Sequence, residues 1–152
     1  MQPPALTIGE AEKLFVKGQS ALQRGRTLPA LACFEKALEL TDTPLYRSYL
    51  AYCIAKERGQ LKKAVSLCEE AIESEPRNPV HYLNLGRIYL HAKKKEEAVS
   101  IFREGLKHEM HEEIIDELQR LVSRKPPVFP FLKRENPINK YIGLVLSTLR
   151  LR

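Results

Sequence analysis

The chain has 152 residues, of which 43% are hydrophobic and 29% charged, and its 25 basic and 19 acidic side chains give a net charge of +6. This composition predicts one soluble globular domain with enough apolar residues to fold alone. No apolar run approaches the ~18 residues that span a bilayer, and residues 1–10 lack the features of a signal peptide, so we expect a cytoplasmic protein.

The first two predicted helices form a pair. A capping-box pattern from Thr7 to Glu10 predicts the start of the first helix, which we expect to end just before Gly25. Its partner is predicted to begin after Thr27, with Pro29 in the first turn, where a missing N–H group leaves no hydrogen bond unmade.

The same start and stop signals return further along the chain. Thr43-Pro44 and Asn78-Pro79 each combine an N-cap residue with a proline, and they predict the first helices of a second and a third pair. Gly59 ends the first helix of the second pair, and Lys93 to Lys95 mark the turn of the third. Three helix–turn–helix units are therefore predicted.

Similar residues recur within these units at a fixed interval of 34 residues. The recurring sets are Ala30, Ala64 and Ala98; Phe34, Cys68 and Phe102; Ala37, Ala71 and Gly105; and Gly18, Tyr52 and Gly86. Small residues let two helices approach, and a bulky residue one turn away fills the adjacent space. This pattern is typical of stacked repeats, for which about three units are the minimum for stability.

The period and its residues resemble the tetratricopeptide repeat (TPR), a helix–turn–helix unit of the same length. The third copy matches best, at Tyr82, Leu85, Gly86, Tyr89, Ala98 and Phe102. The second departs most, with Ser48, Tyr52 and Cys68 where the family has a large, a small and an aromatic residue. The resemblance covers repeats at about 11–44, 45–78 and 79–112. It implies an all-α, right-handed superhelix that serves as an interaction module.

One further amphipathic helix is predicted over residues 111–124 as a capping helix, which completes a repeat domain of residues 1–124. Its apolar side would carry Ile114, Ile115, Leu118, Leu121 and Val122. Prolines 126, 127 and 130 then predict an extended segment, and Asn136-Pro137 begins an amphipathic C-terminal helix. Residues 124–152 carry seven basic side chains and one acidic one, and therefore the whole net charge, so residues 125–152 form a basic tail.

Three roles of this tail stay open. It could fold back onto the repeats as a structural lid. It could dock in a groove of the same or another copy, which gives autoinhibition or self-association. It could also lie on an anionic membrane surface as a basic amphipathic helix. We do not expect nucleic-acid binding, because no aromatic residue interleaves with the basic ones and residues 1–123 are neutral overall.

In the family that the chain resembles, the first helix of each repeat lines a concave groove that holds the ligand. Carried over by register, this implies a partner-binding set of Phe15, Gln19, Tyr46, Tyr49, Lys56, Asn84, Arg87 and His91. Tyr46, Tyr49 and Arg87 have most weight, because Tyr and Arg dominate interface hot spots. Phe15 and Leu83 have packed core as an alternative role.

One subclass of the family holds the C-terminal carboxylate of heat-shock chaperones with a clamp of Lys, Asn and Arg. By register, this chain has other residues at the clamp positions, none of them cationic: Phe15, Gln19, Leu50, Val80 and Asn84. Acidic chain ends would have little to pair with there. The resemblance therefore favours an extended or helical ligand with apolar anchors.

No motif for catalysis, a cofactor or a metal ion is evident. His108 and His111 are three residues apart, one short of the zinc-protease spacing, and the three cysteines lack a CxxC spacing and are predicted to be reduced and buried. We predict a non-enzymatic adaptor or scaffold that binds a peptide or helical segment of a partner protein. The alternatives are a peripheral membrane-surface adaptor held by the tail and a small secretion-type chaperone.

Overall fold

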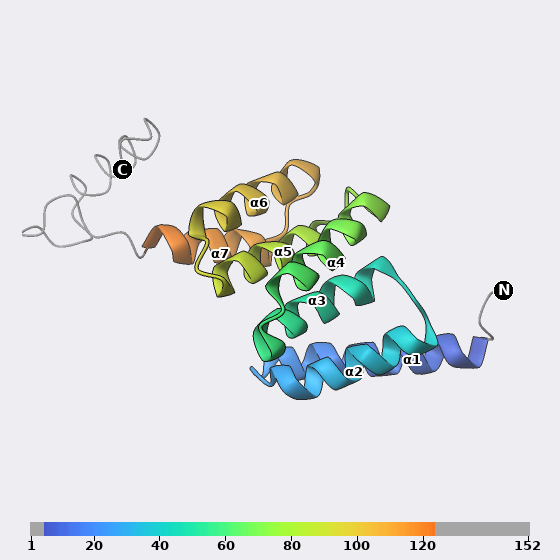
Figure 1. The fold of residues 1–152 in the computed structure, drawn as a ribbon. Helices are drawn as coiled ribbons and strands as arrows, with labels where there is room; N and C mark the ends of the chain where they lie inside the picture. Colours follow the sequence, from blue (N-terminus) through green and yellow to red (C-terminus); the bar gives the residue numbers. More distant parts are fainter. Residues whose placement is uncertain (1–4, 124–152) are drawn as a thin grey trace, which may run out of the picture. The chain divides into compact units, whose positions relative to one another are not determined.

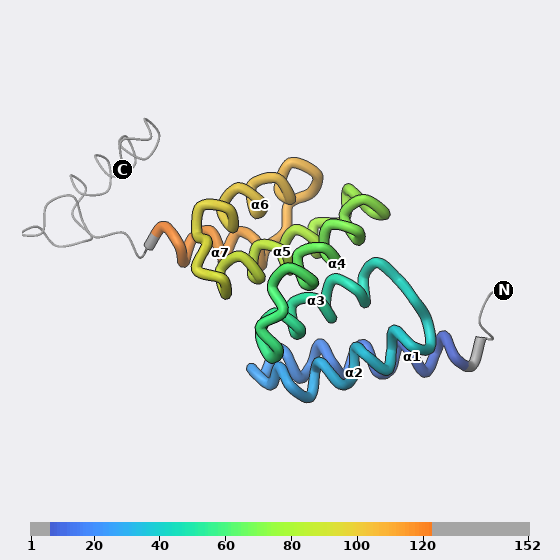
Figure 2. Tube along the Cα trace, viewed as in Figure 1, coloured from blue at the N-terminus to red at the C-terminus, as the bar shows by residue number. Residues whose placement is uncertain are grey.

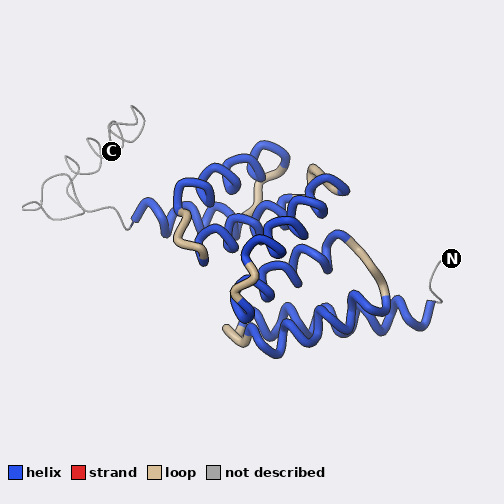
Figure 3. The backbone as a smooth tube through the Cα atoms, viewed as in Figure 1, coloured by secondary structure: helices blue, strands red, loops and turns tan. Residues whose placement is uncertain are grey.

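The structure, a computed structural model, describes residues 5–123. The predicted extended segment and C-terminal helix lie outside the described residues. The described part is helical throughout, with short connections between the helices and no strand (Figures 1 and 3). Its elements are α1 (Ala5–Gln23), α2 (Thr27–Leu40), α3 (Pro44–Arg58), α4 (Leu61–Ser74), α5 (Pro79–His91), α6 (Lys95–His108) and α7 (Glu112–Ser123).

The first six helices form three hairpins. α1 packs against α2, α3 against α4 and α5 against α6, and neighbouring hairpins meet where α3 touches α2 and α5 (Figure 2). The predicted all-α arrangement of three helix–turn–helix repeats is therefore confirmed. The boundary between the two compact units of the chain falls within α7, after Ile115, and the hairpins belong to the first unit.

The helix ends agree with most of the local signals. The side chain of Thr43 accepts a hydrogen bond from the Tyr46 amide at 3.2 Å, and that of Asn78 accepts one from the Val80 amide at 3.1 Å. Gly25, Gly59 and Lys93 have φ values of 71°, 64° and 61° at the three hairpin turns. These left-handed residues reverse the chain between paired helices.

Two details of the prediction were wrong. α1 already includes Ala5, so Thr7 lies inside the helix and does not cap it. Ala5 and Leu6 are strong helix formers, and nothing in their backbone opposes another helical turn. Val122, expected on the apolar side of the capping helix, is 66% exposed, whereas Ile114 is fully buried.

The contact inside each hairpin joins a small residue on one helix to a large one on the other. A Cβ atom on Gly18 would lie 2.5 Å from a ring carbon of Phe34, and one on Gly86 would meet the Phe102 ring. Both rings are fully buried. In the second hairpin the large and small residues are reversed. The large residue is Tyr52 of α3, which packs against the cluster that contains Cys68 of α4.

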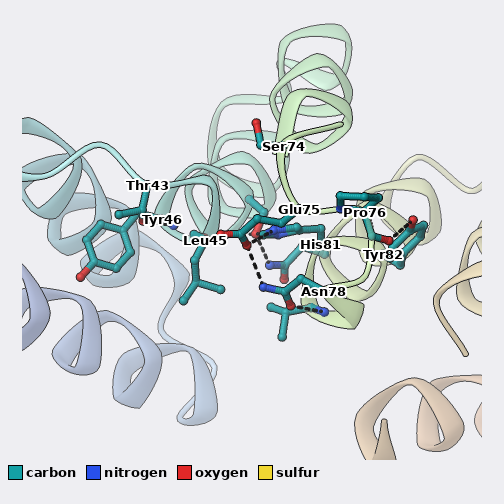
Figure 4. A network of polar contacts seen from close by, with 12 residues as sticks. Thr43, Leu45, Tyr46, Ser74, Glu75, Pro76, Asn78, His81 and Tyr82 are labelled. Carbon is teal, nitrogen blue, oxygen red and sulfur yellow. Dashed lines mark hydrogen bonds and ion pairs between the residues drawn. The ribbon is translucent and has the colours of Figure 1, made fainter. Parts of the chain in front are cut away.

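A polar network connects the second and third hairpins. His81 of α5 is fully buried, with Nδ1 3.0 Å from Ser48 Oγ of α3 and Nε2 2.9 Å from a carboxylate oxygen of Glu75. Asn84 Nδ2 donates to the same Ser48 oxygen at 3.1 Å, and Asn78 Nδ2 donates to Glu75 at 3.0 Å. Figure 4 shows His81 between Glu75 and α3. We call these five residues the Ser48 network.

The geometry of the Ser48 network fits a neutral His81. In the neutral ring, Nε2–H donates to the Glu75 carboxylate and Nδ1 can accept from the Ser48 hydroxyl, whose alternative acceptor is the Leu45 carbonyl oxygen at 3.1 Å. Burial holds the pKa of His81 below its ordinary value, although Glu75 opposes this shift. The Asn78 hydrogen bond, together with His81, lowers the pKa of Glu75.

We predict that Gly86→Ala lowers the free energy of unfolding by about 1–3 kcal/mol, because the added methyl group forces Phe102 out of its position. Gly9→Ala is the matched control. Gly9 also lies inside a helix, but no atom stands within 4 Å of the added Cβ, so we expect a gain of about 0.5–1 kcal/mol. Urea melts measure both variants, and an unchanged midpoint for Gly86→Ala would contradict the packing described.

We further predict that the chain loses stability as the pH falls below about 6.5, by up to about 1.4 kcal/mol per pH unit for this one site. The unfolded chain binds a proton on His81 that the folded chain, with its lowered pKa, does not. Glu75, whose pKa is also lowered, adds a second loss below its ordinary value of 4.5.

Urea melts at a series of pH values check this dependence. His81→Asn should flatten the slope between about pH 7 and 5.5 relative to the parent chain. Equal slopes in the parent and the His81→Asn variant would show that His81 does not titrate as described.

Candidate functional site

Five residues of the predicted partner-binding set lie on the first helices of the three hairpins, and the four on α1 and α3 are joined by ring contacts or a hydrogen bond. They are Phe15 and Gln19 of α1, Tyr46 and Tyr49 of α3, and Arg87 of α5, and we call them the first-helix row. The rings of Phe15 and Tyr46 are stacked, with centroids 4.6 Å apart, and Tyr49 meets Phe15 edge-on at 5.1 Å. These aromatic contacts join α1 to α3.

Polar contacts continue the row towards α5. Gln19 Nε2 donates a hydrogen bond to the Tyr49 hydroxyl at 3.1 Å. Burial raises the pKa of Tyr49, the Gln19 hydrogen bond opposes the rise, and the charges of Glu113 and Arg87 act on the same hydroxyl. Tyr49 therefore stays neutral, and its hydroxyl accepts the hydrogen bond from Gln19.

Arg87 Nη2 lies 3.0 Å from a carboxylate oxygen of Glu113, at the start of α7. The Arg87 side chain is 24% exposed and that of Glu113 is 57% exposed. Glu113 is not in the predicted binding set, because no local sequence pattern relates it to Arg87, 26 residues earlier. A partner carboxylate that approached Arg87 would compete with Glu113 for the guanidinium.

The other predicted residues differ in accessibility. Phe15 is 7% and Asn84 1% exposed, so both support the surface from beneath. Leu83 is 1% exposed and therefore packs in the core, which is the alternative role predicted for it. Lys56 and His91 are exposed at the ends of α3 and α5, and no contact within residues 5–123 ties either of them to the row. Lys56 Nζ instead lies 5.8 Å from the centre of the Tyr52 ring.

Ser48, His81 and Glu75 have the residue types of a hydrolase triad, but their setting does not suit catalysis. Ser48 and His81 are both 0% exposed, so a substrate has no access to the hydroxyl. Burial likewise raises the pKa of Cys53 to about 12 and raises that of Cys68, which keeps both thiols protonated. The Ser48 network therefore acts in packing α5 against α3.

Among residues 5–123, no group of three or more His, Cys, Asp or Glu side chains is placed to hold a metal ion. None of the helices described here combines the length and the apolar character needed to cross a bilayer.

Comparison with known proteins places this arrangement in a family. Two family models described as tetratricopeptide repeat match residues 15–79 and 55–121, which together cover well over half of the chain. A curated relative, the TPR repeat-containing thioredoxin TTL4 of Arabidopsis thaliana, is 30% identical over 95 residues. That match covers 62% of this chain and only 14% of the relative.

Solved structures agree with the fold. The TPR domain of Arabidopsis OM64 gives a TM-score of 0.58 at 21% identity, over 78% of this chain and 99% of that one. The Sgt2 TPR domain of Aspergillus fumigatus gives 0.59 at 20%, over 85% and 93%. The first TPR of Spaghetti (RPAP3), bound to the HSP90 peptide SRMEEVD, gives 0.57 at 22%, over 74% and 93%. The family matches and the three stacked hairpins show that this chain belongs to the tetratricopeptide repeat family.

Proposed function

We propose that the chain is a protein-interaction adaptor that binds a segment of a partner protein along the first-helix row. The observation that carries this proposal is the row itself, in which two half-buried tyrosines of α3 pack on Phe15 and a half-buried arginine lies on the adjacent helix α5. Side chains of these types supply large contact areas and oriented hydrogen bonds at protein interfaces. The Spaghetti (RPAP3) domain, bound to an HSP90 peptide, offers a precedent for peptide binding by a similar fold.

In this proposal the residues of the predicted set have different roles. Tyr46 and Tyr49 provide the apolar contact, and Arg87 binds a polar or acidic group after release from Glu113. Phe15 fixes the Tyr46 ring from below, and Asn84 keeps α5 in place through Ser48. Lys56 and His91 add exposed charge and polarity at the edge of the surface.

A capture experiment tests the proposal. The tagged full chain and its variants Tyr46→Ala and Lys56→Glu are incubated with lysate, and captured proteins are quantified by mass spectrometry. We expect Tyr46→Ala to lose about tenfold or more of the specific partner, since a lost hot-spot contact costs about 2 kcal/mol or more, and Lys56→Glu, at the edge of the surface, to lose less.

Lys36→Glu is the matched control for the charge change, because Lys36 is exposed on α2, outside the row. It should capture the partner like the parent chain, and melting curves should show that all variants fold. Partners retained by Tyr46→Ala and Lys56→Glu but lost by Lys36→Glu would place the interface elsewhere.

We also predict that the chain does not bind the peptide SRMEEVD with the affinity expected of a carboxylate clamp. The positions that would form a clamp by register hold no cation, and three of them, Phe15, Leu50 and Asn84, are 7%, 7% and 1% exposed. Isothermal titration calorimetry of the full chain checks this expectation, with a clamp-containing TPR domain as the positive control. Saturable micromolar binding would refute it.

A further inference from the structure

A second surface lies away from the first-helix row, between the second and third repeats. A depression of about 1000 Å³ opens there, lined by the α3–α4 turn, the start of α4, the end of α5 and the α5–α6 turn. None of the five residues of the first-helix row lines it. Its size is that of pockets that hold ligands in proteins. We call it the α4–α5 pocket.

The inner part of the α4–α5 pocket is apolar. Ile88 is fully buried at its base, and Val65, Tyr89 and Ala92 are partly buried around it. Tyr89 replaces an alanine of the second repeat, Ala55, at the same register position. Burial raises the pKa of Tyr89, so its hydroxyl stays protonated. This surface suits an apolar side chain with a hydrogen-bonding group beside it.

The rim of the α4–α5 pocket is mainly basic. Lys62, Lys63 and Lys94 line it against the single acidic residue Glu69. Within residues 5–123 these three lysines are exposed and make no ion pair. The third repeat carries the opposite charge at the positions of Lys62 and Lys63, namely Glu96 and Glu97. The positive rim is therefore particular to this pair of repeats and complements carboxylates.

We propose that the α4–α5 pocket binds a short acidic segment of a partner protein, with one large apolar side chain seated on Val65 and Tyr89 and carboxylates facing the lysines. This site is separate from the first-helix row and goes beyond the function proposed above. A bilayer fits the surface less well, because the apolar atoms are recessed. None of the large apolar residues that protrude from the described chain (Ile8, Val16, Leu28, Met110 and Val122) lines the pocket.

Isotope-labelled full chain titrated with the peptide Glu-Asp-Glu-Leu-Phe-Asp-Glu tests the proposal by NMR. We expect saturable amide shifts centred on residues 59–66 and 88–94, with a dissociation constant below about 1 mM. Replacing Leu-Phe of the peptide by Gly-Gly should weaken binding about tenfold or more, because the apolar anchor is lost.

The paired variant Lys62→Glu/Lys63→Glu should also weaken binding about tenfold or more. Acidic residues suit the first turn of a helix, so this variant should fold at least as well as the parent chain. Lys13→Glu/Lys17→Glu is the matched control, since both lysines are exposed on α1, outside the pocket. It should bind the peptide as the parent does.

Three results would overturn the proposal. The first is the absence of shifts at residues 59–66 and 88–94 up to about 1 mM peptide, the range of the weakest specific association. The second is an equal loss of binding in the two lysine pairs, which indicates attraction by net charge alone. The third is binding to phosphatidylserine vesicles that depends on Lys62 and Lys63, without any peptide shifts, which would assign the pocket to lipid. Capture through the first-helix row is measured with other variants and does not depend on these results.

Discussion

The structure depends on one steric relation, in which a small residue on one helix of a hairpin faces a large residue on the other. Gly18 and Gly86 admit the rings of Phe34 and Phe102, which become fully buried between the paired helices. The second hairpin has a tyrosine in the glycine position and Cys68 in the phenylalanine position. The large residue then lies on the first helix of the hairpin, and α3 and α4 still pack against each other although the second repeat departs from the family pattern.

Pairing within the hairpins leaves the contacts between them to other side chains, and these differ along the chain. α1 and α3 meet through aromatic rings and the hydrogen bond from Gln19 to Tyr49. α3 and α5 meet through the buried contacts of Ser48 with His81 and Asn84. The first-helix row crosses both junctions, so a partner that binds it would contact all three repeats. The α4–α5 pocket lies at the second junction, where the rim carries lysines.

Most of the fold could be predicted because its signals are local or periodic. Thr43 and Asn78 cap helices within their own turns, and the interval of 34 residues aligns the hairpins. The helix start predicted from the capping box at Thr7 was wrong, because the strong helix formers Ala5 and Leu6 extend the helix before it. Ser48 stood out as a departure from the family, but its partners His81 and Asn84 become evident only when α5 packs on α3.

The residues of the proposed binding surface were harder to predict than the helices. Register places Phe15 and Asn84 on the first helices, but it does not show that neighbouring side chains cover them. The pairing of Arg87 with Glu113 depends on how α7 begins after the last hairpin, which no repeat signal determines. Accessibility therefore had to come from the packed structure, and it separates the tyrosines that a partner can reach from the residues that support them.

Site-specific photocrosslinking tests the central claim, that partners bind along the first-helix row, most directly. p-Benzoylphenylalanine is placed at Tyr46 in one sample and at Lys36, on the exposed side of α2, in another, and both are irradiated in lysate. The account predicts that position 46 forms a covalent adduct with a specific partner protein and that position 36 does not. An adduct with that partner at position 36 alone would contradict the claim.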